Sequence, residues 1–199
     1  MEVIKPGLGA IILAAGQGSR YRQVAGADQD KLLAACKGRD GVVRSVIEQS
    51  LRNLPPSIEQ RLLVTTADRP EVARLARAYG CEVLLLASTG MGDSIAAAVA
   101  ACPGLEGWLV LLGDMPFVLP QSISRVAAQV TADTISVPVH AGELGHPVGF
   151  GASFAKGLMG LSGDRGAKPL FAAAKVVQVT VEDPGVLWDV DVPQALVFP

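Results

Sequence analysis

Residues 8–20 read LGAIILAAGQGSR, and this stretch decides the fold. Its first six residues, Leu8–Leu13, carry no polar side chain and include two β-branched isoleucines. A short continuous apolar run is typical of a strand buried on both faces of a parallel sheet. Gly16 and Gly18 follow at once, so we expect the strand to run through a tight loop into a helix. The stretch therefore predicts the first strand–loop–helix unit of an α/β protein.

Apolar runs and segments with helical periodicity alternate along the rest of the chain. This order predicts βαβ units, and hence a three-layer α/β/α, Rossmann-like domain with a mostly parallel, mixed sheet. No repeat, low-complexity tract or linker interrupts the sequence, so we expect a single domain over residues 1–199. Further strands are predicted at 61–65, 82–86, 108–112, 135–139, 148–150 and 176–181, and helices at 42–54, 71–79, 93–102, 120–130, 153–159 and 168–174.

Charge and cysteine content narrow the classes of function. Seventeen basic and nineteen acidic residues give a net charge of -2 without a basic run, which argues against a nucleic-acid partner. The apolar stretch at 8–15 is too short to span a bilayer, and its flanks resemble a strand and a loop rather than a signal peptide, so no membrane association is expected. The three cysteines, Cys36, Cys81 and Cys102, are widely spaced and suit a reducing cytoplasm.

The loop after the first strand is a candidate phosphate-binding loop. Ligands of open α/β sheets bind outside the carboxyl ends of the strands. Small residues at 14–19 let a backbone approach a phosphate closely, and Arg20 and Lys31 add positive charge. The loop is not a Walker motif, and Tyr21 stands where a dinucleotide-binding fingerprint needs its third glycine. A tight turn without a ligand is the alternative interpretation.

A second glycine-rich loop, Ser88-Thr89-Gly90-Met91-Gly92-Asp93-Ser94, also precedes a predicted helix. Asp93 or Ser94 could serve there only as the helix N-cap. Two such loops at the same edge of one sheet favour a nucleotide pocket more than either loop alone.

Three aspartates follow predicted strands and are candidate metal ligands. Asp114 ends a fully apolar strand, where a carboxylate is costly to bury without a partner. Asp189 and Asp191 follow the last strand. Magnesium binds through one or two carboxylates and substrate phosphates, so Asp114 with either or both of the later aspartates predicts a Mg²⁺ site. For Asp189 and Asp191 the alternative is capping of a helix that begins near Pro193.

Two further features could contact an acceptor substrate. His146, in Gly-His-Pro, is one of two histidines, and it is a candidate for positioning or packing rather than for proton transfer. Residues 163–168 combine turn chemistry with an acid and two cations, Asp164, Arg165 and Lys168. They would hold an anionic group, or they form an exposed turn with solvated charges.

Six short motifs follow one another along nearly the whole chain. They are Leu-Ala-Ala-Gly with Ser19, Arg20 and a later Lys31, then Gly-Met-x-x-Ser at 90–94, Gly-Asp-Met-Pro at 113–116, Gly-His-Pro at 145–147, Gly-Asp-x-Gly at 163–166 and Asp-x-Asp-x-Pro at 189–193. In this order the motifs resemble those of the nucleotidyltransferases of molybdenum cofactor biosynthesis, and specifically the molybdenum cofactor cytidylyltransferases.

The resemblance implies a fold of the nucleotide-diphosphosugar-transferase type and an activity. The activity is Mg²⁺-dependent transfer of CMP from CTP to the phosphate of Mo-molybdopterin, with release of pyrophosphate. Ala15, Gly113 and Met115 resemble the cytidylyl rather than the guanylyl enzymes. The implied residues are Arg20, Lys31 and Asp114 for catalysis; Leu13, Ala14, Ala15, Gly16, Gly18, Ser19, Gly90, Met91 and Ser94 for the nucleotide; Asp114, Asp189 and Asp191 for metal; and His146, Asp164, Arg165 and Lys168 for the acceptor.

The chain departs from the family pattern in two places, and other functions stay open. Nine residues separate Tyr21 from Lys31, so Lys37 or Arg39 could supply the second cation instead, and Val192 replaces a threonine. A guanylyl- or adenylyltransferase acting on molybdopterin or a sugar phosphate is the nearest alternative. An NAD(P)-dependent oxidoreductase and a non-catalytic nucleotide-binding protein are alternatives of other classes. A molybdoenzyme or a cofactor chaperone would be a protein partner.

Overall fold

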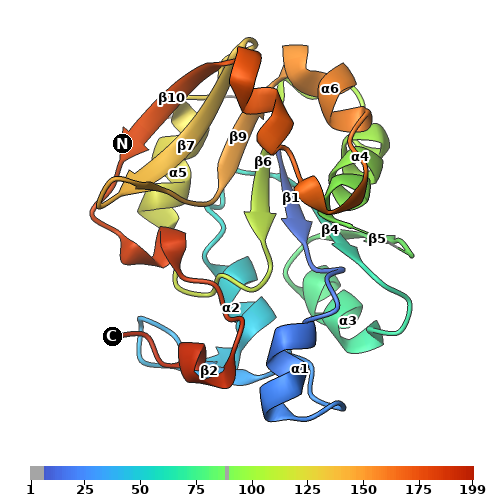
Figure 1. The fold of residues 1–199 in the computed structure, drawn as a ribbon, viewed down its shortest axis with the longest axis vertical. Coiled ribbons are helices and arrows are strands. Elements are labelled where there is room, and N and C mark those ends of the chain that lie inside the picture. Colours follow the sequence, from blue (N-terminus) through green and yellow to red (C-terminus); the bar gives the residue numbers. More distant parts are fainter. Residues whose placement is uncertain (1–6, 88–89) are drawn as a thin grey trace.

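The computed structural model describes residues 7–87 and 90–199, and an eight-stranded mixed sheet forms its centre (Figure 1). The strand order is β10-β7-β9-β6-β1-β4-β5, and β8 pairs with β7 at the side. A separate two-stranded hairpin pairs β2 (Ala35–Lys37) with β3 (Val43–Ser45). The sheet strands are β1 (Leu8–Leu13), β4 (Gln60–Thr65), β5 (Glu82–Leu85), β6 (Gly107–Leu112), β7 (Thr134–His140), β8 (Glu143–Leu144), β9 (Val148–Gly151) and β10 (Lys175–Thr180).

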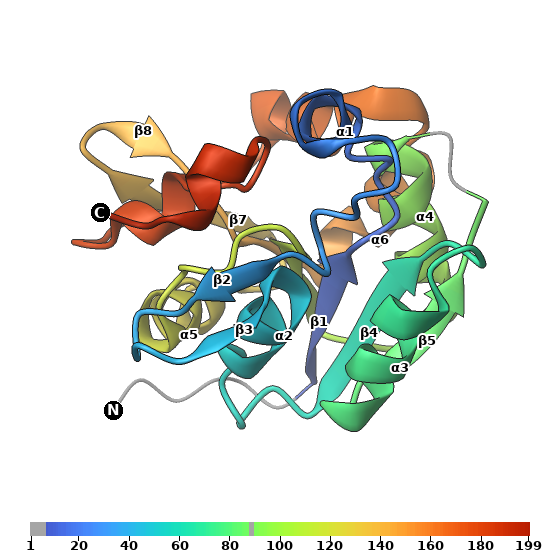
Figure 2. The same ribbon diagram turned by 90° about the horizontal axis from the view of Figure 1, so that it is seen from below.

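Helices cover both faces of the sheet, as Figure 2 shows from below. The alternate residues Leu8, Ala10 and Ile12 of β1 join the core on the face covered by α2, α3 and α5. Ile11 joins the core of the other face, with side chains of α4 and α6. The helices are α1 (Ser19–Ala25), α2 (Val46–Arg52), α3 (Pro70–Ala78), α4 (Met91–Ala101), α5 (Pro120–Ala128) and α6 (Ala155–Met159), with 3-10 turns at Ala152–Phe154, Gly163–Arg165, Lys168–Ala173, Pro184–Leu187 and Pro193–Leu196.

The strand order creates a crevice beside β1. This strand is parallel to both of its neighbours, and Leu13 stands opposite Val64 of β4 and Leu112 of β6. The chain leaves β1 toward β4 on one side and later returns to β6 on the other. Such a switch point opens a crevice outside the carboxyl ends of the two strands. Helix α1 and the β2–β3 hairpin lie beyond those ends (Figure 1).

The predicted fold class is confirmed, with a mostly parallel mixed sheet between two layers of helices. The helix expected over 42–54 is wrong at its start, because Val43–Ser45 pairs with Ala35–Lys37 and the helix begins only at Val46. Ser45 and Glu48 form a capping box there. The helix expected over 168–174 is a 3-10 turn, and that over 153–159 divides into a 3-10 turn and α6. Strands β2 and β8 were not predicted.

No helix within the described ranges is long and apolar enough to cross a membrane.

A buried carboxylate, Asp183, joins three parts of the fold. Its oxygens accept hydrogen bonds from the backbone of Leu119 at 2.9 Å and from Ser122 Oγ at 2.7 Å, where α5 begins. Arg39, in the loop between β2 and β3, donates to the same carboxylate at 2.6 Å. A fourth donor is the backbone of Gly185. A charge buried in this way is stable only while its partners are present.

We expect Asp183→Ala to lower the free energy of unfolding by about 3 kcal/mol, because it leaves buried donors and Arg39 without their acceptor. Urea unfolding followed by circular dichroism measures the change. The control is Glu182→Ala, which removes a neighbouring carboxylate whose side chain is exposed. Equal stability of the two variants would contradict the structural role of Asp183.

Candidate active site

A cleft of about 410 Å³ lies outside the carboxyl ends of β1 and β6. It brings together segments that are far apart in the sequence, and most residues predicted for the nucleotide and the metal line it. Ser19 and Arg20 are not part of its lining. The lining residues are Leu13, Ala14, Ala15, Gly16, Gln17, Gly18, Lys31, Leu32, Gly90, Met91, Ser94, Leu112, Asp114, Asp164, Asp189 and Asp191.

The loop after β1 forms one wall of this cleft. Ala14 still donates to Val64 in β4 at 2.8 Å, and Gly18 takes a left-handed φ of 62° as it starts α1. Within the described part of the chain, the backbone N–H groups of Gly16, Gln17 and Gly18 donate to no protein acceptor. Gly16 also has no atom within 4 Å of the position that a Cβ would occupy. The loop therefore offers open donors to an anionic ligand.

Lys31 lies at the centre of the site. Its Nζ donates to Asp114 Oδ2 at 2.5 Å and to Asp191 Oδ1 at 3.0 Å, and its side chain is only 11% exposed. Burial alone would lower the pKa of Lys31, but the charges of Asp114 and Asp191 outweigh it and raise the pKa. Lys31, rather than Lys37 or Arg39, thus meets the acidic pair, while Arg39 binds Asp183.

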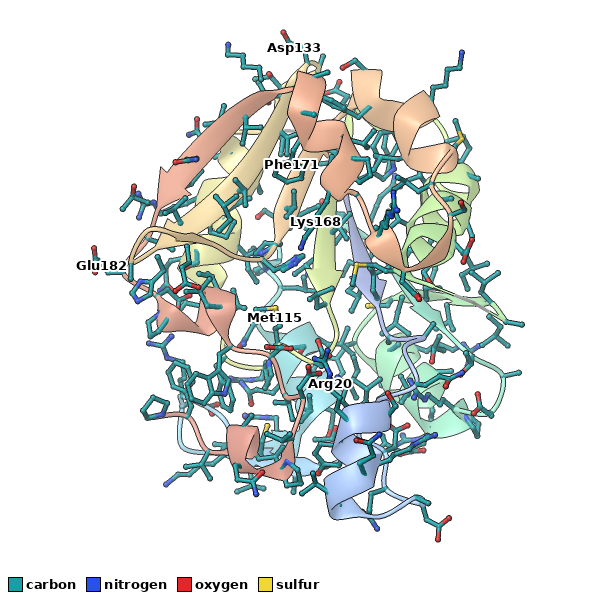
Figure 3. All side chains as sticks on the ribbon, in the orientation of Figure 1. Arg20, Met115, Asp133, Lys168, Phe171 and Glu182 are labelled. Atoms are coloured by element: carbon teal, nitrogen blue, oxygen red, sulfur yellow. The ribbon has the colours of Figure 1, made fainter. Side chains whose placement is uncertain are left out.

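Arg20 closes the same cluster from the solvent side. Its Nη1 lies 2.7 Å from Asp191 Oδ2, although the arginine side chain is 78% exposed. Arg20 and Met115 are labelled in the lower middle of the view in Figure 3. The pKa of Asp191 is lowered, because hydrogen bonds and charges from Lys31 and Arg20 exceed the effect of its burial. An exposed ion pair contributes little stability, so Arg20 can exchange Asp191 for a phosphate at low cost.

The loop that carries Asp114 is held from three sides. Ser50 and Asn53, at the end of α2, donate to the carbonyl oxygens of Gly113 and Pro116, each at 2.9 Å. The amide of Gly113 donates to the Leu13 carbonyl at 2.9 Å, and a Cβ at Gly113 would stand 3.0 Å from that oxygen. The carbonyl of Asp114 itself accepts from Val190 at 2.9 Å. These contacts fix Asp114 next to the loop after β1.

Asp189 and Asp191 flank the buried Val190 and face Asp114. The alternative that they cap a helix is wrong: Val192 occupies the N-cap of the turn at Pro193–Leu196, and no side-chain cap bond forms. Desolvation, followed by the charges of Asp191 and Asp114, raises the pKa of Asp189. Among the described residues no group of three His, Cys, Asp or Glu side chains is arranged as a metal site. The negative charge that crowds Asp189 still suits a divalent cation held by one or two carboxylates and by substrate phosphates.

The second glycine-rich loop packs against the turn at Gly163–Arg165. A Cβ at Gly90 would come 2.3 Å from the carbonyl carbon of Gly163, and Asp93 Oδ2 accepts from the Gly163 amide at 3.3 Å. Helix α4 begins at Met91 with Gly90 as N-cap, so the expectation that Asp93 or Ser94 caps it is wrong. Ser88 and Thr89 lie outside the described residues. The motifs at 90–94 and 163–166 thus form one wall of the cleft, and their close contact explains why residue 90 is a glycine.

A larger cavity of about 940 Å³ adjoins the cleft and shares Met91 and Asp164 with it. Its floor is apolar, with Phe171 edge-on to Phe150 at 6.4 Å, and the labelled Lys168 and Phe171 lie over the sheet in Figure 3. The cavity is lined by Met91, Ile95, Val110, Val137, Leu144, Gly145, His146, Val148, Phe150, Asp164, Arg165, Gly166, Ala167, Lys168, Pro169 and Phe171.

His146 lies in the wall of this second cavity. Its amide donates to the Val186 carbonyl at 2.8 Å, while its Nδ1 is buried without a hydrogen-bond partner among the described residues. Burial lowers the pKa of His146 against the opposing effects of Asp114 and of the Val110 backbone, and so favours the neutral ring. The ring lines the cavity, while its unpaired Nδ1 is covered by protein.

Several supporting residues were not predicted from the sequence. Gln17, Leu32 and Leu112 line the cleft, and Ser50 and Asn53 hold the Asp114 loop. Gln17 and Leu112 could have been predicted from the rule that ligands bind at the carboxyl ends of the strands. Ser50 and Asn53 act from a helix, and no sequence signal separates them from ordinary surface residues.

This fold, with its cleft at the switch point, belongs to the Rossmann-like α/β class. The chain belongs to the family described as the MobA-like NTP transferase domain, whose model matches residues 10–179.

A curated relative matches most of this chain. Bifunctional protein GlmU from Synechococcus sp. (strain CC9311) is 32% identical over 152 residues, which cover 74% of this chain and 32% of that protein. The chain therefore spans about a third of that relative's length.

Two solved structures share the fold. A nucleotidyl transferase from Methanothermobacter thermautotroptrophicus matches with a TM-score of 0.80 and 23% identity, over 96% of this chain and 94% of that one. Rv0371C from Mycobacterium tuberculosis H37Rv, in complex with manganese, matches with a TM-score of 0.69 and 24% identity, over 88% of each chain.

We expect Gly90→Ala to weaken nucleotide binding about tenfold or more, because its methyl group would displace the turn at Gly163 from the cleft wall. Isothermal titration calorimetry with an NTP and Mg²⁺ measures the affinity. Gly160→Ala is the control, since its Cβ would meet its nearest neighbour, the Lys156 carbonyl oxygen, at an ordinary 3.4 Å. Unchanged affinity in the Gly90→Ala protein would show that this wall takes no part in nucleotide binding.

Proposed function

We propose that the chain transfers CMP from CTP to the terminal phosphate of Mo-molybdopterin in a Mg²⁺-dependent reaction that releases pyrophosphate. The observation that carries the proposal is Lys31 between Asp114 and Asp191, in the cleft that the loop after β1 also lines. Membership of the NTP transferase family supports the reaction class. The motifs around Ala15, Gly113 and Met115 support CTP and the molybdopterin acceptor.

The reaction needs positioning and charge stabilisation more than covalent help from the protein. An oxygen of the acceptor phosphate attacks the α-phosphorus of CTP and forms a new P–O bond. The bond from that phosphorus to the bridging oxygen breaks, and pyrophosphate leaves with the electron pair. The acceptor phosphate is already anionic at neutral pH, so no general base is required.

Each part of the cleft has a role in this scheme. Asp114, with Asp189 or Asp191, would hold Mg²⁺, which when bound neutralises charge on the nucleotide phosphates. The amides of Gly16–Gly18 bind phosphate oxygens, and Lys31 and Arg20 stabilise the charge that builds toward pyrophosphate. Gly90, Met91 and Ser94 line the base and ribose.

The adjoining cavity fits an acceptor with a flat apolar body and an anionic end. Phe150 and Phe171 provide the apolar floor, and Arg165 and Lys168 provide cations at the same cavity. The ring of His146 and the carboxylate of Asp164 line this cavity and suit the polar edge of a pterin. Because Asp164 belongs to both cavities, the acceptor phosphate can lie beside the nucleotide. A molybdoenzyme or a cofactor chaperone would receive the product.

The alternative of an NAD(P)-dependent oxidoreductase has less support. Tyr21 is 5% exposed within α1, at the position where a dinucleotide fingerprint needs a glycine for close helix packing. An oxidoreductase also gives no role to the cluster of Lys31 with two carboxylates.

The activity is tested by incubating the purified protein with Mg²⁺, Mo-molybdopterin and each NTP separately. We expect pyrophosphate release with CTP and little with GTP or ATP. Release with GTP or ATP instead would keep the reaction class and overturn the choice of base. A folded protein that binds an NTP but releases pyrophosphate with none would overturn the acceptor.

We expect Asp114→Asn and Lys31→Ala each to lower kcat by about 10²–10³, the usual loss when one preorganised charge contact is removed from a transition state. Steady-state pyrophosphate release measures the change. Asp133→Asn removes an exposed carboxylate at the opposite end of the molecule and serves as the control (Figure 3). A folded Asp114→Asn protein with wild-type kcat would rule out the metal assignment.

A further inference from the structure

Arg69, a buried arginine outside the cleft lining, connects two parts of the candidate active site. It follows β4 and is only 6% exposed, although a guanidinium is costly to bury. Its Nη1 donates to the carbonyl oxygen of Ala14 at 2.8 Å, in the loop after β1. Its Nε lies 3.1 Å from Asp30 Oδ2, an ion pair between side chains that are 6% and 16% exposed. One side chain therefore joins the phosphate-loop wall to the residue before Lys31.

Asp30 uses both carboxylate oxygens. While Oδ2 faces Arg69, Oδ1 accepts a hydrogen bond from the amide of Leu32 at 3.0 Å. The Asp30 carboxylate thus links the backbone of Leu32, the residue after Lys31, to the side chain of Arg69. The guanidinium therefore holds Ala14 through a hydrogen bond from Nη1 and Asp30 through an ion pair, and Nε itself makes no hydrogen bond among the described residues.

Contacts on the other side complete the fixation of Lys31. The side chain of Leu32 is buried, and its carbonyl accepts from the Ile47 amide of α2 at 2.9 Å. The Lys31 stem passes over Gly18, with Cγ 3.5 Å from the position of a Cβ there. With the backbone held at both neighbours and the stem in contact with the loop, Nζ has little freedom except toward Asp114 and Asp191.

We propose that Arg69 and Asp30 form a brace that positions Lys31 for catalysis, an inference that rests on the proposed function. Arg69 and Asp30 are positioning residues in this scheme, because they act through Lys31. The brace also gives the long segment between Tyr21 and Lys31 a role, since its last residue, Asp30, anchors the lysine to the end of β4.

The first test is Asp30→Asn, which keeps the acceptor for the Leu32 amide but removes the charge that faces Arg69. We expect kcat for pyrophosphate release to fall about tenfold or more, because small misplacements of a catalytic group are costly. Asp28→Asn makes the same change of charge at an exposed residue of the same segment and should keep the wild-type kcat. An unchanged kcat in a folded Asp30→Asn protein would overturn the brace.

A double-mutant cycle separates positioning from a general structural effect. In a Lys31→Ala background, Asp30→Asn should cause no further loss of kcat, because the group that it positions is gone. A loss that adds fully to that of Lys31→Ala would show that Asp30 acts independently and would overturn the inference.

A local readout keeps the test independent of the proposed function. The amides of Leu33 and Ala34 donate to the carbonyls of Asp30 and Lys31 at 3.1 and 3.3 Å. We expect their hydrogen exchange to become faster in Asp30→Asn and to stay unchanged in Asp28→Asn. If the wild-type protein transfers no nucleotide, the proposed function fails while exchange still reports on the brace. Unchanged exchange at both amides would overturn the brace even in an active enzyme.

Discussion

The site depends on one interaction, the contact of the Lys31 ammonium with two carboxylates that come from distant parts of the chain. Asp114 and Asp191 repel each other and lose hydration in the cleft, so each needs a positive partner. Lys31 supplies it to both at 2.5 and 3.0 Å. The parallel pairing of β1 with β6 brings Asp114 next to the loop after β1. The hydrogen bond from the Val190 amide to the Asp114 carbonyl places the neighbouring Asp191 at the same site.

Residues outside the cleft hold the segments that make this contact. Helix α2 holds the Asp114 loop through Ser50 and Asn53, and Arg69 holds the segment of Lys31. Beyond them, the last segment is anchored where Phe198 stacks on Phe117 at 4.7 Å and Arg39 lies 5.0 Å from the Phe198 ring. The loop of Asp114 and the segment of Lys31 are therefore each fixed by residues outside the cleft, as electrostatic preorganisation requires.

The sequence predicted what depends on local pattern. Apolar runs identified the sheet strands except β8, and the rule that ligands bind at strand ends located Gly16, Gly90, Asp114 and Asp191. It failed where a structure depends on distant partners. Val43–Ser45 has helical periodicity but becomes a strand because Ala35–Lys37 pairs with it. Arg69 stands 55 positions from Ala14, and nothing in the spacing announces their contact.

The wall shared by the two cavities has a consequence for how two ligands would bind. Met91 and Asp164 face both the cleft and the larger cavity. A nucleotide that restricts these side chains would remove part of the entropy that the acceptor must otherwise pay. Thermodynamic linkage makes that benefit mutual, so each ligand would tighten the other by the same factor. Two sites that look separate in space would then behave in solution as one cooperative binding unit.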